Sequence, residues 1–249
     1  MKAKASSYSS VSAPRIVSRQ VWLAARRKHL AHEKEFTRRR DALSQERRKL
    51  PWVKVEQDYV FTGPKGKRTL SELFDGRSQL IVYHFMFGPG WDEGCRGCSY
   101  VADHFAGMLP HLQARDVALV AVSHAPLKEF QPFQRRMGWR FPWFSSHGSS
   151  GNPDFNVSWP AAQIEKKKVE YNYRLREVPM EEMPGLSVFI RNDIGEIFHT
   201  YSSYSRGLDL LIGTYNYLDL VPKGRDEEKL EQSMQWVRHH DRYEAKAAV

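Results

Sequence analysis

The stretch "HFMFGPGWDEGCRGCSYVADHF", residues 84 to 105, decides the fold and contains the chain's only two cysteines, Cys95 and Cys98. Its first residues end the nearly apolar run 79–87, "QLIVYHFMF", which is typical of a strand buried on both faces. The loop "GPGWDEG" follows, and both cysteines then stand where a helix is expected to begin. The stretch therefore predicts a buried strand, a loop and a helix that starts at a cysteine.

The residues that follow repeat the same rhythm. Apolar side chains recur at helical spacing from about Cys95 to Gln113, and the apolar run "DVALVAVS" gives a second buried strand. Another helix is expected between Pro126 and Gly138, since proline favours a first helical turn and glycine a helix end. Because right-handed crossovers place successive strands parallel and adjacent, the sequence predicts an α/β fold.

The cysteine pair stands at a position that favours redox chemistry. Free N–H groups and the macrodipole at a helix start stabilise a thiolate at Cys95, and Arg96 acts in the same direction. The i, i+3 spacing places Cys98 on the same face of the first helical turn, where its sulfur can attack an adduct formed on Cys95. We therefore predict that Cys95 is the nucleophile and Cys98 the resolving thiol.

Other roles for the pair remain open. A zinc site needs four ligands, but a second C-x-x-C pair is missing. His124 follows the second buried strand and is the best placed histidine, either as a site residue or as a solvent-facing one. Two buried thiols without chemistry are the remaining alternative. Redox chemistry is the favoured interpretation, with no metal and no organic cofactor.

Most of the positive charge lies in an N-terminal arm. The chain has a net charge of +9, and residues 18–50 hold eleven Lys or Arg against four Asp or Glu, a net +7. This segment has no Gly or Pro, and one apolar stripe repeats every seven residues: Trp22, Phe36, Leu43 and Leu50, with His29 among them. We expect a basic helical arm over residues 15–50 that packs on its own domain or forms a homo-oligomer. Binding to nucleic acid is the less favoured reading, because acidic residues interrupt the basic clusters.

The remaining segments complete the predicted organisation. Residues 1–14 are Ser-rich and expected to be disordered, residues 51–222 form the main domain, and residues 145–183 are an insertion in it. Residues 223–249 are rich in charge and predict a C-terminal helix. A hairpin is expected to turn at residues 192–195. No apolar run is long enough to cross a membrane and no secretory signal is evident, so a cytoplasmic location is expected.

The motifs resemble a known family. The runs "RSQLIVYHFMFGPGWDEGCRGCSYVADHF", "DVALVAVSHAPL" and "MPGLSVFIR" are similar to the bacterial family called domain of unknown function 899, which is grouped with thioredoxin-like folds. More distantly, the chain resembles the alkyl hydroperoxide reductase and thiol-specific antioxidant group. The resemblance implies a thioredoxin-like αβα sandwich, with Cys95 as the attacking thiol and Cys98 as the resolving thiol.

Two positions depart from thioredoxins, which have Trp directly before the first cysteine and a cis-proline directly before a later strand. Here Trp91 lies four residues before Cys95. Pro184 is followed by Gly-Leu-Ser, so its isomer is open and Ser187 is a candidate for the position facing the cysteines. The threonine that peroxiredoxins have three residues before the cysteine is also missing.

These observations predict a cytosolic thiol–disulfide oxidoreductase or thiol peroxidase. Its substrate would be a thiol, disulfide or peroxide, and an unidentified reductant would regenerate the pair. The alternative is a non-catalytic binding module on a thioredoxin-like scaffold, which would bind nucleic acid through the basic arm.

Overall fold

The central strand β4 (Gln79–His84) is the element from which the fold is built. In the computed structural model, which describes residues 15–244, β4 pairs in parallel with β5 (Val117–Ser123) and antiparallel with β9 (Gly185–Arg191). All but two of its residues are buried, because helices cover one face of the sheet and loops and a short helix cover the other. The buried parallel pair expected from the two apolar runs is confirmed.

The sheet has eight strands in the order β1-β10-β9-β4-β5-β6-β2-β3. The outer members are β1 (Val53–Lys54), β2 (Val60–Gly63), β3 (Gly66–Thr69), β6 (Trp143–Ser145) and β10 (Ile197–Tyr204). Strand β6 continues the parallel series, and β9 and β10 form the expected hairpin, which turns at residues 192–195. The order β10-β9-β4-β5, with β4 and β5 parallel and β9 reversed, is the core of a thioredoxin-like fold, which is confirmed.

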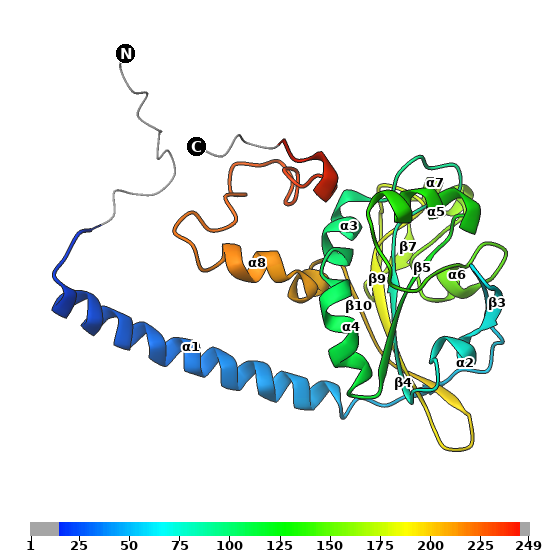
Figure 1. The fold of residues 1–249 in the computed structure, drawn as a ribbon, viewed down its shortest axis with the longest axis horizontal. Helices are drawn as coiled ribbons and strands as arrows, with labels where there is room; N and C mark the ends of the chain where they lie inside the picture. Colours follow the sequence, from blue (N-terminus) through cyan, green and yellow to red (C-terminus); the bar gives the residue numbers. More distant parts are fainter. Residues whose placement is uncertain (1–14, 245–249) are drawn as a thin grey trace, which may run out of the picture.

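Helices cover one face of this sheet more fully than the other (Figure 1). The first layer consists of α3 (Arg96–Ala102), α4 (Phe105–Gln113), α5 (Leu127–Arg136) and α8 (Gly213–Leu218), which follows a 3₁₀ segment, η1 (Ser205–Leu211). Their apolar side chains pack with Tyr83 and Phe85 of the sheet region into one large aromatic core. The opposite face packs against the short helix α2 (Leu70–Leu73) and Phe155. These two cores define the αβα sandwich.

The single helix expected from about Cys95 to Gln113 is divided in two. Helix α3 ends before Asp103, whose carboxylate accepts hydrogen bonds from Trp139 Nε1 and from the ring of His240. His104 then contacts Thr214 at the start of α8. The break thus allows side chains at the junction to bind two other segments of the chain.

The segment inserted after β6 forms a small core of its own. It contains α6 (Gly151–Asp154), α7 (Ala161–Glu165) and a two-stranded ribbon of β7 (Val169–Tyr171) and β8 (Arg174–Arg176). Its buried side chains pack with Tyr204 of β10. This packing fixes the position of Pro184, which follows the inserted segment and leads into β9.

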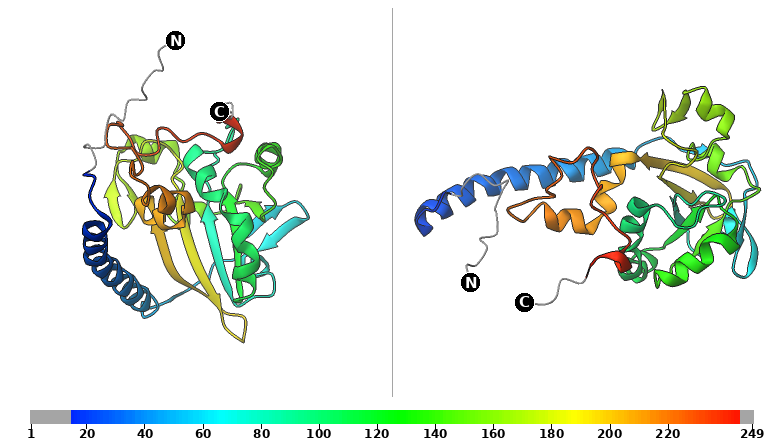
Figure 2. Two further views of the ribbon diagram at one scale, coloured as in Figure 1. Left: turned by 60° about the vertical axis from the view of Figure 1, so that its left-hand side comes forward. Right: turned by 90° about the horizontal axis from the view of Figure 1, so that it is seen from above.

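The arm forms the long helix α1 (Arg19–Arg47), capped by the side chain of Ser18. None of its residues is buried, and the helix runs away from the sheet (Figures 1 and 2). The arm is therefore helical as expected, but its apolar stripe does not pack on its own domain. The disorder expected for residues 1–14 lies outside the described residues.

The C-terminal helix expected for residues 223–249 is wrong for the described part, residues 223–244. This segment runs through turns and ends in a short 3₁₀ turn, η2 (His240–Arg242). Its side chains bind the domain instead: Val237 is fully buried, and Trp236 packs edge-to-face on Tyr100. Tertiary contacts thus outweigh the helical preference of a charge-rich sequence.

Candidate redox site

Cys95 lies at the junction between the loop after β4 and helix α3. It is the residue directly before the helix, and its backbone N–H donates to the carbonyl of Met86, 3.1 Å away. That bond ties the loop to the end of the strand region. Gly94, the preceding residue, has no room for a side chain, because a Cβ there would lie 2.6 Å from the Phe85 ring. The sequence "EGC" therefore sets the sulfur at the helix start.

The surroundings of Cys95 favour its thiolate. The thiol of Cys98 donates a hydrogen bond to the Cys95 sulfur. The backbone N–H groups of Gly97 and Cys98 donate to the same sulfur, and the positive charge of Arg96 stabilises the thiolate further. Although burial opposes them, these donors lower the pKa of Cys95 to about 7. Cys95 is partly exposed. A substantial fraction of a reachable nucleophile is thus present at neutral pH.

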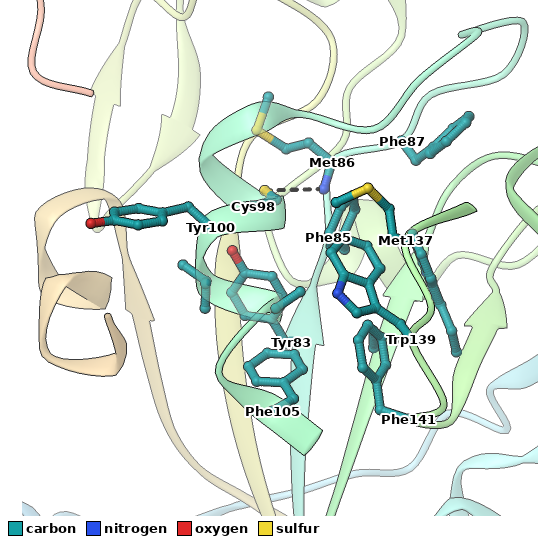
Figure 3. Packing of buried hydrophobic residues seen from close by; sticks show 14 of the residues in the cluster. Tyr83, Phe85, Met86, Phe87, Cys98, Tyr100, Phe105, Met137, Trp139 and Phe141 are labelled. Carbon is teal, nitrogen blue, oxygen red and sulfur yellow. Dashed lines mark hydrogen bonds between the residues drawn. The ribbon is translucent and has the colours of Figure 1, made fainter. Parts of the chain in front are cut away.

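Cys98 has the opposite character. It is 1% exposed, and burial and the neighbouring Cys95 raise its pKa well above the usual value. Its sulfur accepts a hydrogen bond from the backbone N–H of Met86, at 3.4 Å (Figure 3). The hydroxyl of Tyr83 also donates to this sulfur. The pair therefore consists of an ionisable outer thiol and a protonated inner thiol.

Tyr83 is a site residue that the sequence analysis did not identify. It lies on β4, is 1% exposed, and points its hydroxyl toward Cys98 (Figure 3). Residues on this strand alternate between faces, so Tyr83 shares the helix-covered face with Phe85. The sequence feature that could have revealed Tyr83 is a tyrosine within a nearly apolar strand, because a buried hydroxyl needs a hydrogen-bond partner.

Both cysteines line a cavity of about 230 Å³. Segments far apart in sequence form its other walls: Tyr83, Pro184, Leu208, Ile212, Tyr215 and Met234. Of the four tyrosines 201, 204, 215 and 217, only Tyr215 lines this cavity. The peptide bond before Pro184 is trans, since the described residues contain no cis bond. Pro184 thus faces the cysteines in the trans form.

Arg96 and Trp91 stand near the pair without lining the cavity. Arg96 is exposed and borders a shallow groove beside Cys95, together with Arg238 and Arg242. Trp91 packs partly buried against the large core, and its indole lies against Gly88. Arg96 thus acts on the Cys95 sulfur through its charge, whereas Trp91 has a packing role in the loop.

Ser187 and His124 are not brought to the cysteines. Ser187 shares the sheet face of its partner Val82, opposite to that of Tyr83, and hydrogen-bonds His84 and Ser202. Residues alternate between the two faces of a strand, and the neighbouring Leu186 lies on the same face as Tyr83. Ser187 therefore lies on the other face, and the suggestion that it faces the cysteines is wrong. His124 Nδ1 lies 2.8 Å from the buried carboxylate of Glu182.

The contact between His124 and Glu182 raises the pKa of His124. It forms part of a polar cluster in which Ser158 also donates to Glu182. Within residues 15–244, no group of three or more His, Cys, Asp or Glu side chains gathers as metal ligands would. The same part of the chain has no helix long and apolar enough to cross a membrane.

Fold and site together define a thioredoxin-like protein with a C-x-x-C pair at a helix start. The chain belongs to the family described as "Bacterial protein of unknown function (DUF899)", which it matches over residues 11–243. No curated protein matches it.

Solved structures that match include two peroxiredoxins. The peroxidoxin BcpB from Mycobacterium tuberculosis is 16% identical, with a TM-score of 0.43, and the match covers 66% of this chain and 95% of that one. Peroxiredoxin Q from Xanthomonas campestris is 14% identical, with a TM-score of 0.39, over 61% of this chain and 86% of that one.

Proposed function

We propose that this protein is a thiol–disulfide oxidoreductase or thiol peroxidase that works through Cys95 and Cys98. The observation that carries the proposal is the unequal state of the two neighbouring thiols. Cys95 is partly exposed with a pKa of about 7, whereas Cys98 is buried and has a raised pKa. An ionised outer thiol and a protected inner thiol are what a two-step dithiol reaction needs.

The reaction with a disulfide proceeds in two exchanges. The Cys95 thiolate attacks one sulfur of R–S–S–R′, which forms a Cys95–S–S–R bond and releases R′S⁻. Cys98 then loses its proton and attacks the Cys95 sulfur, which forms the Cys95–Cys98 disulfide and releases RS⁻. The substrate gains two electrons and the dithiol loses two. An external dithiol reductant would restore the pair, and the reducing cytoplasm is the compartment in which we place this cycle.

A peroxide is the other substrate class that the pair can reduce. The Cys95 thiolate would attack the outer oxygen of R–O–O–H, which gives a sulfenic acid on Cys95 and releases ROH. Cys98 would then displace the hydroxyl as water and form the same disulfide. Both reactions end in one oxidised state, so the same variants test both.

Substitution of the resolving thiol is expected to trap the first step. In Cys98→Ser, a small disulfide should leave one stable mixed disulfide per chain, because no second thiol can displace it. Wild-type protein should instead lose about 2 Da as the intramolecular disulfide closes. Cys95→Ser, the matched control, should form neither product. Intact-mass spectrometry of each reduced protein before and after treatment measures all three.

The assay also separates the two substrate classes and tests the assigned roles. Hydrogen peroxide in place of the disulfide should leave a sulfenic acid in Cys98→Ser if peroxide is a substrate. Adducts that accumulate only in Cys95→Ser would exchange the two roles. If neither variant forms an adduct and wild-type protein stays reduced, the redox function is wrong.

We also propose that the arm α1 binds a second copy of this chain. The helix has no buried residue, and its stripe exposes Trp22, Phe36 and Leu43, with 53%, 65% and 56% of each side chain exposed. Tertiary contact normally stabilises an amphipathic helix, so the stripe needs a partner. Residues 208–231 carry six acidic and three basic side chains and expose Leu210, Tyr217 and Leu220. This surface complements the arm in charge and polarity.

Two charged substitutions on the stripe, Phe36→Glu with Leu43→Glu, are expected to convert an oligomer into a monomer. The matched control, Thr37→Glu with Ser44→Glu, adds the same charge beside the stripe and should leave the oligomer intact. Light scattering gives the mass of each species, which should fall about twofold or more in the stripe variant. A monomeric wild-type protein would contradict the proposal. Nucleic-acid binding with a steep salt dependence would instead support the binding-module alternative.

A further inference from the structure

The C-terminal segment crosses the mouth of the cysteine site. Residues 223–242, here called the C-terminal strap, run from beyond α8 to the start of α3 (Figures 1 and 2). Its Met234 lies so near Gly97 that a Cβ on that glycine would be 3.5 Å from the methionine sulfur and 3.8 Å from Cys95 Sγ. Met234 has a φ of +64°, which side-chain-bearing residues rarely adopt. The fold thus holds a strained methionine over the pair.

Contacts on both sides of Met234 fix the strap in place. One carboxylate oxygen of Glu227 accepts from Tyr215 OH at 2.8 Å, from Met234 N at 3.0 Å and from Trp236 Nε1 at 2.6 Å. Further along, His239 is buried, and its Nε2 donates to the carbonyl of Gly94 at 2.9 Å. These contacts hold the strap in one position across the cavity.

The charges that border the cavity are already paired. Arg206 lies 2.9 Å and Arg225 3.2 Å from Asp209, and Arg225 also pairs with Asp219 at 2.7 Å. The guanidinium of Arg225 covers the Tyr215 ring, 3.8 Å from its centroid. The remaining walls are largely apolar, from Val101, Leu208, Ile212 and Met234. This lining favours an uncharged group over an anion.

Building on the proposed function, we infer that the site reduces small disulfide-type substrates that carry an apolar group on the attacked sulfur, and that it excludes protein disulfides. The cavity of about 230 Å³ is smaller than the roughly 300 Å³ at which drug-sized ligand pockets begin. A polypeptide would have to reach Cys95 past the strap, whose Arg238, His239 and Arg242 also line the groove beside Arg96. A short alkyl group is small enough to enter this cavity, which Met234 and Leu208 line together with Cys95.

Alkyl methanethiosulfonates provide matched probes, because only the group R changes along the series. The Cys95 thiolate attacks the sulfenyl sulfur of R–S–SO₂CH₃, which forms Cys95–S–S–R and releases methanesulfinate. Cys98 then loses its proton, attacks Cys95 and releases RS⁻, so the dithiol loses the two electrons that the reagent gains. For each reagent, the rate constant with Cys95 is divided by the rate constant of the same reagent with the thiolate of N-acetylcysteine. This ratio removes differences in intrinsic reactivity between the reagents.

The normalised rate is expected to rise about fourfold with each added methylene from methyl to propyl, as each buries in the cavity. For the trimethylammonioethyl and sulfonatoethyl reagents, the normalised rate should be at least tenfold lower than for the propyl reagent. Insulin should be reduced no faster by this protein than by N-acetylcysteine.

The polar variant Met234→Gln should lower the propyl rate about threefold or more and leave the rates of the charged reagents within twofold. Met180→Gln, an exposed methionine in the inserted segment, is the matched control and should change nothing.

Three outcomes would overturn the inference. Equal normalised rates for all R groups would mean that the cavity does not bind R. A preference for the sulfonate would assign recognition to the groove of Arg96, Arg238 and Arg242. Rapid insulin reduction would show that the strap admits proteins. A different outcome would contradict the proposed function itself: R stays attached to Cys95 in the wild-type protein, and the Cys95–Cys98 disulfide does not form.

Discussion

Iodoacetamide is expected to modify Cys95 at least about 100 times faster than Cys98 at neutral pH. The thiolate is the nucleophile, and the pKa of Cys95 is about 7, whereas that of Cys98 lies well above 9. At pH 7 about half of Cys95 is ionised, whereas Cys98 is almost entirely protonated, so nearly all of the thiolate is on Cys95. Burial of Cys98, which is 1% exposed, slows its reaction further. Peptide mass spectrometry of samples quenched over time gives both rates.

The pH dependence follows from the same pKa shift. Because the pKa of Cys95 is lowered, its alkylation rate should rise with pH and reach half its maximum near pH 7 rather than near the usual thiol value. Below that pH the thiolate is protonated and the rate should fall about tenfold per unit. The control is the unfolded protein in guanidinium, where both cysteines should react at similar rates. Equal rates in the folded protein would contradict the assigned roles.

The parts of the site that the sequence predicted are those set by local patterns. The apolar run 79–87, the glycine- and proline-containing loop and the helix that starts at Cys95 all lie within one stretch of chain. A helix start lowers a thiol pKa through its own N–H groups, so the lowered pKa of Cys95 could be predicted without any tertiary contact. The raised pKa of Cys98 depends mainly on its burial by the rest of the fold. The fold class followed from the same periodicities.

The missing parts depend on contacts between distant segments. Tyr83 reaches Cys98 only because β4 and α3 stack, and Met234 reaches Gly97 only because the strap crosses α3. The predicted C-terminal helix failed because Glu227 binds Tyr215, Met234 N–H and Trp236 instead of solvent. Ser187 was assigned to the wrong face because sequence spacing did not fix the phase of β9 relative to Pro184.

The aromatic core beneath the cysteine loop depends on Trp143. This residue is 1% exposed, its ring stacks on Phe130 with centroids 4.6 Å apart, and it lies 4.5 Å from the ring of Phe85. Its Nε1 donates to Ser123 Oγ at 2.9 Å, which in turn donates to the carbonyl of Phe85. Since the Phe85 ring lies against Gly94, the tryptophan supports the residue directly before Cys95.

The substitution Trp143→Ala is expected to lower the free energy of unfolding by about 3–5 kcal/mol, the range for truncating a buried aromatic residue. That loss is a large share of the roughly 5–15 kcal/mol that stabilises a typical domain. Trp52→Ala removes a side chain that is 52% exposed and should cost less than about 1 kcal/mol. Urea unfolding followed by circular dichroism measures both. Because Phe85 would lose its neighbour, folded Trp143→Ala should also show a smaller difference in alkylation rate between Cys95 and Cys98. A loss similar to that of Trp52→Ala, with an unchanged alkylation ratio, would mean that this core neither stabilises the domain nor holds the loop.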